Sequence, residues 1–173
     1  MSNSGKNDDL VASELGRPPQ LDSAEHNRLV EAAEFDDIRM MQSSFSVVPR
    51  YFDEAIADMR NFEINSSITE PVFDAESKKL ISAFEYCIEV NIEGEQLLYC
   101  KAMYLVAFTI EGDFDLETMK YFARRVGRNA SYPYFREFAS SQSWASNADL
   151  PILPILKTGS VKKSAAEISA AER

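Results

Sequence analysis

The feature that most limits the fold is a pair of long runs of alternating residues at 80–92 and 97–110, separated by the turn sequence EGEQ at 93–96. Period-two alternation over this length is typical of β-strands. A four-residue connection that contains glycine joins strands that are antiparallel neighbours. The two runs therefore predict a long antiparallel hairpin.

The second run is apolar on both of its faces. One face has the residues LCAYVFI and the other LYKMLAT, with a single charged side chain, Lys101. A sheet that exposes one face to water is usually polar on that face. Both faces should therefore be covered, either by helices of the same chain or by a partner subunit or a bound peptide, because large exposed apolar patches are rare unless they are used.

The segments before the hairpin predict a short helix and two strands. Residues 22–35 (DSAEHNRLVEAAEF) have capping residues followed by apolar residues at helical spacing. Strands are expected at 38–48, which ends before Pro49, and at 62–68. Residues 51–60 between them could form a short helix or a long crossing loop.

The segments after the hairpin predict two helices and an extended strip. One helix is expected over 116–127, and a second begins at the capping residue Ser131 with Pro133 in its first turn and runs to about 143 or 144. The sequence DLPILPIL at 149–156 has two closely spaced prolines, so we expect it to run extended along an apolar surface.

The charge of the chain argues against a nucleic-acid partner. Lys and Arg number 18 and Asp and Glu 28, which gives a net charge of −10 and a pI of about 4.6. Phosphate binding needs clustered cations. The polar first twenty residues do not resemble a secretory signal, and no stretch has the ~20 apolar residues needed to span a bilayer, so a cytoplasmic location is expected.

The sequence offers no catalytic constellation. Its single histidine, His26, is expected on a polar helix surface, and Cys87 and Cys100 lie in apolar strand runs that predict buried free thiols. Six scattered glycines form no phosphate-binding loop. We therefore expect no catalytic residues, no metal ligands and no cofactor, and a function based on binding.

Residues 94–156 resemble the second half of the SecB family of export chaperones. The resemblance rests on the strand with Cys100, the run that closes in IEG at 110–112, the helix sequence YPYFRE at 132–137, and LPILP at 150–154. Residues 38–92 are similar to the first three strands of the family in length and order, with weaker identity.

The resemblance implies an α+β fold with a four-stranded antiparallel sheet and helices packed on one face. It implies a SecB-like domain over 22–157, preceded by a disordered extension at 1–21 and followed by a mobile tail at 158–173. It also implies a homotetramer, built as a dimer of dimers, that binds unfolded client polypeptide in apolar grooves without ATP.

The same resemblance assigns candidate binding residues. Two groups are implied, one in the client groove and one at an oligomer interface. The client-binding candidates are Phe62, Ile64, Ser66, Leu153 and Ile155, of which Ser66 replaces an apolar residue of the family, and the interface candidates are Tyr104, Phe108, Tyr134 and Phe138.

One departure from the family bears on the partner. SecB proteins deliver clients to the translocase motor SecA through an acidic surface, and the matching positions here are Gln42, Ser46 and Lys101, none of which is acidic. Loss of complementary charge lowers specificity and association rate. We therefore favour a dedicated chaperone that protects an antitoxin in a toxin–antitoxin–chaperone system over a general export chaperone that serves SecA, with a purely structural assembly subunit as the third interpretation.

Overall fold

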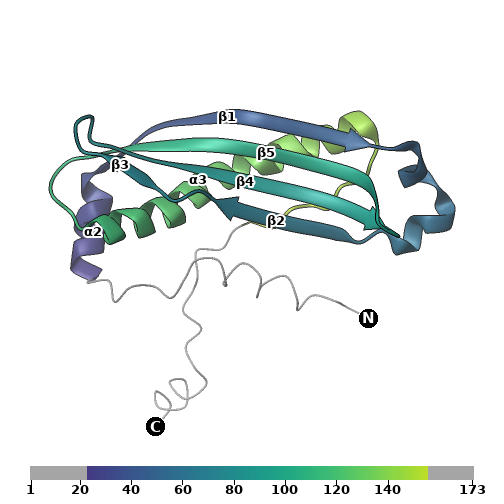
Figure 1. Ribbon diagram of the computed structural model, residues 1–173, viewed down its shortest axis with the longest axis horizontal. Helices are drawn as coiled ribbons and strands as arrows, with labels where there is room; N and C mark the ends of the chain where they lie inside the picture. The colour runs from purple at the N-terminus through teal and green to yellow at the C-terminus, as the bar shows by residue number, and fades with distance from the viewer. Residues whose placement is uncertain (1–22, 156–173) are drawn as a thin grey trace, which may run out of the picture.

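The computed structural model describes residues 23–155, and these form one antiparallel sheet with helices on one face (Figure 1). The sheet order is β1-β5-β4-β2, and β3 pairs with β4 beyond the end of β2. The predicted α+β class with an antiparallel sheet is confirmed, but the sheet has five strands rather than four. The strands are β1 (Ala33–Val47), β2 (Phe62–Ile68), β3 (Val72–Asp74), β4 (Lys79–Ile92) and β5 (Glu95–Ile110).

The predicted hairpin is the centre of the sheet. β4 and β5 pair along almost their whole length, from Lys79 opposite Thr109 to Ile92 opposite Glu95. The turn is tighter than expected, because only Glu93 and Gly94 lie outside the strands, and both have positive φ (54° and 82°). Positive φ at both central residues matches the twist of a two-residue hairpin turn.

The two faces of the hairpin differ in coverage. The side chains of β5 alternate between buried and half-buried, and those of β4 nearly so. The buried set points to the helices, and we call this the helix-side face and its reverse the open face. Helices of this chain therefore cover one face, and the structure shows no element of residues 23–155 over the other.

A single long helix lies across the helix-side face. α3 (Leu116–Ser146) begins at Asp115, whose carboxylate accepts a hydrogen bond from the Thr118 amide at 3.0 Å. The expectation of two helices is wrong, because the chain stays helical through Pro133.

Side-chain hydrogen bonds hold the part of α3 that precedes Pro133. Proline removes one backbone donor from the helix interior, which frees a carbonyl one turn earlier. In that turn the Ser131 hydroxyl donates to the Gly127 carbonyl at 2.8 Å, and the Tyr86 hydroxyl of β4 donates to the Arg128 carbonyl at 3.3 Å. The sheet thus supplies one donor to α3 at the Arg128 carbonyl, next to the Asn129 carbonyl that Pro133 leaves without a backbone donor.

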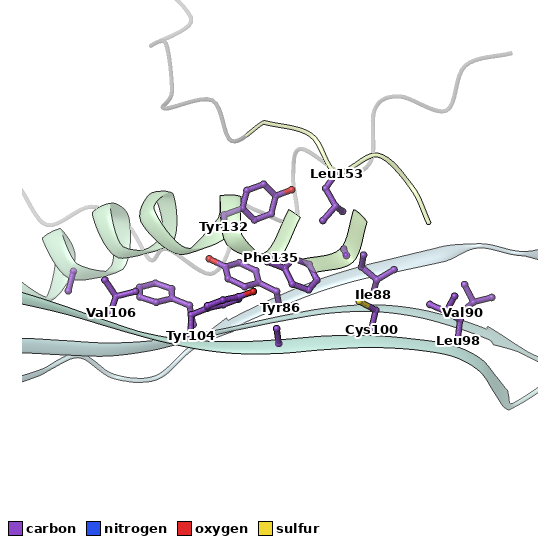
Figure 2. Close-up of a cluster of buried hydrophobic side chains, with 14 of the residues drawn as sticks. Tyr86, Ile88, Val90, Leu98, Cys100, Tyr104, Val106, Tyr132, Phe135 and Leu153 are labelled. Atoms are coloured by element: carbon purple, nitrogen blue, oxygen red, sulfur yellow. The ribbon is translucent and has the colours of Figure 1, made fainter. Parts of the chain in front are cut away.

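The helix and sheet are closest at Gly127. A Cβ atom at this position would lie 2.5 Å from the ring of Phe84, so only glycine permits this approach. About two helical turns further along, Phe135 stacks on Tyr86 with ring centroids 5.2 Å apart, and both are buried (Figure 2). These contacts fix α3 over the middle of β4 and β5.

The N-terminal part differs from the prediction in its boundaries. α2 (Ser23–Ala32) ends earlier than expected, and β1 takes the residues from Ala33 onward. β1 is an edge strand with register shifts between Phe35 and Asp37 and between Met40 and Gln42. Residues 49–59 form two short 3₁₀ turns, η1 (Pro49–Phe52) and η2 (Glu54–Met59), that cross between the two edges.

The domain limits predicted from the sequence stay predictions. The SecB-like domain expected over 22–157 contains every described residue. The extension at 1–21 and the tail at 158–173 lie outside the described residues. The extended strip at 149–156 is confirmed over 149–155, which has no helix or strand.

Candidate functional site

The helix-side face is incompletely covered at its β2 edge. Phe62, Ile64 and Ser66 pair with Val90, Ile88 and Tyr86 of β4, so all three point to the helix-side face. Ile64 is 38% exposed, although its pairing partner Ile88 is fully buried. The structure therefore brings the three strand candidates for client binding onto one side of one edge strand.

Ser66 differs from the other two because it is already bonded to α3. Its hydroxyl oxygen accepts a hydrogen bond from Nη2 of Arg128 at 3.2 Å. The polar replacement at this position thus connects the edge strand to the helix instead of adding apolar groove surface.

The segment after α3 forms the other wall of this edge. The helix ends at Asn147, whose left-handed conformation (φ 56°, ψ 34°) reverses the chain. Arg136 then donates from Nε to the carbonyl of Leu153 at 3.0 Å, and the Tyr51 hydroxyl donates to the carbonyl of Ala148. These bonds hold the extended segment across the helix-side face.

Leu153 and Ile155 have different environments. Leu153 is 4% exposed and points toward the sheet above Ile88 (Figure 2), whereas Ile155 is 71% exposed. Leu153 therefore forms part of the wall, and Ile155 offers free apolar surface.

A hollow of about 480 Å³ lies between this segment and the end of α3. Its lining combines apolar side chains with serines, Asn147 and the charged Arg136 and Asp149. It includes Trp144 and Ile152, which are 87% and 95% exposed. An exposed tryptophan next to an exposed isoleucine is uncommon on a surface that has no partner. We use the name β2-edge groove for two apolar surfaces taken together, namely Phe62 and Ile64 of β2 and the hollow at Trp144 and 150–153 with the neighbouring Ile155.

A second open apolar region lies at the other edge. Phe35, Met40 and Met41 of β1 are each about half exposed, as is Tyr134 of α3. Tyr134 lies near Tyr104, the residue of β5 that pairs with Met40, and the two tyrosine ring centroids are 6.3 Å apart. We call these four residues the β1-edge patch.

The interface candidates from the sequence divide between core and surface. Tyr104 and Phe108 are each 2% exposed beneath α3, so they belong to the core of the chain itself and the expectation of a subunit contact is corrected for both. Phe138 is half-buried against the same core, and Tyr134 is exposed in the β1-edge patch. The sequence showed two apolar faces on β5 but not which face α3 covers.

The open face contains the three positions that correspond to the acidic SecA-binding positions of the family. Gln42 and Ser46 pair with Met103 and Tyr99, which places them on the open face with Lys101. Lys101 forms an ion pair with Glu85 at 2.7 Å, and this contact raises the pKa of the lysine. The lysine therefore neutralises a carboxylate of the same face.

The two cysteines of the strands are buried thiols. Burial raises the pKa of Cys87 and of Cys100 to about 12, so both are protonated thiols at neutral pH. Both are buried and free, as predicted.

His26, expected on the surface, is half-buried and meets the ring of Tyr121 edge-on. Within residues 23–155 no group of three or more His, Cys, Asp and Glu could hold a metal ion.

The sequence did not reveal the exposed residues that contribute most apolar surface to the β2-edge groove and the β1-edge patch. Trp144 and Ile152 lie at the end of the predicted helix and in the proline strip, and Met40 and Met41 lie in a predicted strand. A strand with two consecutive methionines and a tryptophan between serines were the available signals.

None of the helices in the described part of the chain is long and apolar enough to cross a membrane.

This chain is similar to known SecB-like chaperones, although no protein-family model matches it. The SecB-like chaperone SmegB of Mycolicibacterium smegmatis is 29% identical over 136 residues, which are 78% of this chain and 82% of the relative. The Mycobacterium tuberculosis Rv1957 SecB-like chaperone, solved in complex with a ChAD peptide from the Rv1956 HigA1 antitoxin, superposes with a TM-score of 0.61 at 18% identity. The match covers 78% of this chain and 94% of that one. The predicted resemblance to SecB-like chaperones is therefore confirmed.

Proposed function

We propose that this protein is an ATP-independent SecB-like chaperone that binds unfolded client polypeptide and is dedicated to an antitoxin. The single observation that carries the proposal is the β2-edge groove, in which Ile64, Trp144, Ile152 and Ile155 are exposed although the adjoining core is closed. The relatives with which the chain compares are chaperones, and one is bound to an antitoxin peptide.

The groove suits a client that has no fixed structure. The hydrophobic contribution to binding scales with apolar area, roughly 25 cal/mol per Å², and requires no pocket of a particular shape. A protein that binds the unfolded form of a client and not its folded form shifts the folding equilibrium of the client by mass action. The client-binding residues in this proposal are Phe62, Ile64, Leu153 and Ile155. Ser66 has a structural role instead, because its hydroxyl bonds Arg128.

The charge of the open face favours a dedicated client over delivery to SecA. Gln42, Ser46 and Lys101 replace acidic positions, and Lys101 neutralises Glu85 on that face. The function as a general export chaperone is the second candidate, supported by the shared family alone.

We also propose a homotetramer in which the β1-edge patch contributes to contacts between copies. The patch combines Phe35, Met40, Met41 and Tyr134 at the free edge of β1. Covering half-exposed apolar side chains on two copies at once removes this surface from water. Light scattering of the full chain should give four times the chain mass, and Tyr134→Glu should reduce the mass. A monomeric wild type would contradict the tetramer.

The test of the chaperone function is suppression of aggregation. A denatured protein is diluted into buffer with the full chain, and turbidity is followed in the absence of nucleotide. We expect suppression at a stoichiometric ratio, and we expect pull-down from cells to recover one antitoxin. Failure to keep any denatured polypeptide soluble would refute the chaperone function, whereas recovery of SecA with many precursors would favour the export role.

A further inference from the structure

A small hollow opens between β2 and α3 next to the β2-edge groove. Its lining is Ser66, Ser67, Ile68, Phe84, Tyr86, Arg124 and Arg128. The sheet side combines two serines of β2 with Ile68, Phe84 and Tyr86, and the two arginines come from consecutive turns of α3. The hollow therefore places positive charge beside aromatic and aliphatic side chains.

The two arginines are in different electrostatic states. Arg124 forms an ion pair with Glu70, which also pairs with Lys120 at 3.0 Å. Arg128 has no carboxylate partner among residues 23–155, and its hydrogen bond there is to the neutral hydroxyl of Ser66. Its Nε atom is buried and has no acceptor within the described part of the chain. A guanidinium with a buried donor left free is a site for an incoming acceptor.

The register of the sheet explains why no neighbouring carboxylate reaches Arg128. Glu63 and Glu89 pair with each other, and Glu85 pairs with Ser67, so all three point to the open face. The chain has a net charge of −10, yet this part of the helix side presents an uncompensated cation. The charge of the hollow is thus opposite to that of the molecule as a whole.

We infer that the mouth of this hollow, whose interior of about 20 Å³ holds little more than one water-sized group, binds the carboxylate of an acidic side chain of the client through the guanidinium of Arg128, while neighbouring apolar residues of the client fill the β2-edge groove. This inference rests on the proposed chaperone function and specifies the chemistry of its client. Carboxylates accept paired hydrogen bonds from arginine, and such charge-assisted bonds are about twice as strong as neutral ones.

The spacing along β2 defines the client sequence further. Ser66, Ile64 and Phe62 lie on the same face at intervals of two residues, about 6.8 Å in an antiparallel strand. β2 is the last strand in the sheet order at this edge, and no strand among the described residues pairs with its outer side. An extended segment of a client can therefore pair there. A client strand that places its acidic residue opposite Ser66 would place apolar residues two and four positions away opposite Ile64 and Phe62.

The test compares fluorescein-labelled twelve-residue peptides by fluorescence anisotropy with the full chain. Each peptide has Leu and Phe two positions apart in a Gly/Ser background, and the variable residue stands two positions outside each of them, so that either chain direction brings one copy to Arg128. The variable residue is Asp, Asn or Lys. We expect the Asp peptide to bind about tenfold more tightly than the Asn peptide, and the Lys peptide to bind most weakly.

The matched variants are Arg128→Gln and Arg125→Gln. Arg125 is the next exposed arginine on α3 and does not line the hollow. In Arg128→Gln the preference for Asp over Asn should fall to about one. In Arg125→Gln the tenfold preference should remain.

A measurement on the wild type keeps the inference testable if Arg128→Gln does not fold. Raising NaCl from about 50 to 500 mM should reduce the Asp preference, because salt screens a charge contact, and should leave the Asn peptide nearly unaffected. Equal binding of Asp and Asn peptides by the wild type, or tightest binding of the Lys peptide, would overturn the inference and leave the chaperone function standing. Failure of all three peptides to bind would overturn the inference, and the aggregation assay decides the chaperone function separately. An Asp preference that disappears as the protein concentration rises would assign the hollow to a second copy of the chain, and would overturn the client assignment.

Discussion

The middle and the edges of the helix-side face have the same kind of side chains but opposite exposure. On β4 and β5, tyrosines, phenylalanines and aliphatic residues are buried beneath α3, whereas Ile64 on β2 and Phe35 on β1 are 38% and 52% exposed. α3 lies across the middle strands and leaves both edges partly open (Figure 1). The comparison indicates that the middle stabilises the fold and that the edges are available for binding.

Two phenylalanines test this division directly. Phe135 is fully buried on Tyr86, so Phe135→Ala should lower the free energy of unfolding by about 3–5 kcal/mol. Phe35→Ala at the β1 edge should lower the free energy of unfolding of the single chain by less than about 1 kcal/mol. Urea denaturation of both variants measures the difference. Equal losses would show that the edge is as much a part of the core as the middle.

The close approach at Gly127 provides the next test. In Gly127→Ala the new methyl group would meet the Phe84 ring at 2.5 Å, and overpacking of this kind costs about 1–3 kcal/mol. The better helix propensity of alanine offsets about 1 kcal/mol of that loss. We expect a lower melting temperature by calorimetry, and a smaller effect of the same change when Phe84→Leu is already present. Additive effects of the two substitutions would contradict direct contact between them.

Two tyrosines within the middle separate hydrogen bonding from packing. The Tyr86 hydroxyl lies 2.8 Å from the Ser131 hydroxyl and donates to the helix backbone, whereas the buried Tyr104 hydroxyl has no partner within residues 23–155. Tyr86→Phe should lower the free energy of unfolding by about 1–2 kcal/mol, and Tyr104→Phe should leave it unchanged or raise it slightly. Denaturation of both variants in parallel is the measurement. A larger loss for Tyr104→Phe would mean that its hydroxyl has a partner in solution.

The smallest stability effect and a clear binding effect are expected at the β2 edge. Ile64→Ser should change the free energy of unfolding by less than about 1 kcal/mol but weaken the binding of an unfolded peptide by about threefold to tenfold, because it removes apolar area from the groove. Val72→Ser is the matched control, since Val72 is 65% exposed and pairs with Ile81 on the open face. Equal loss of affinity in the two variants would move the binding surface away from the groove.

Several features of the candidate site could be predicted from residues near each other in the sequence. The alternation at 62–68 placed Phe62, Ile64 and Ser66 on one face, and the two prolines at 151 and 154 excluded a helix there. The pairing of Ser66 with Arg128 could not be predicted, because these residues are far apart in sequence and meet only where α3 crosses the edge of the sheet.

The core assignments show the same limit. The sequence indicated that Tyr104 and Phe108 are apolar strand residues on one face, but their assignment to a subunit contact was wrong because α3 covers that face. The break expected near Ser131 was also wrong, since the chain stays helical through Pro133 and the hydroxyl of Tyr86, a residue of a distant strand, bonds the Arg128 carbonyl of the same helix.

The sequence by itself determined the long hairpin, the acidic charge, the buried free cysteines and the resemblance to SecB-like chaperones, because alternation, composition and motifs are properties of local sequence. The tertiary structure decided which face of the sheet is closed, which edge side chains remain open and which arginine lacks a carboxylate. These depend on the position and angle of one helix across the sheet, and that placement results from long-range packing between residues such as Gly127 and Phe84.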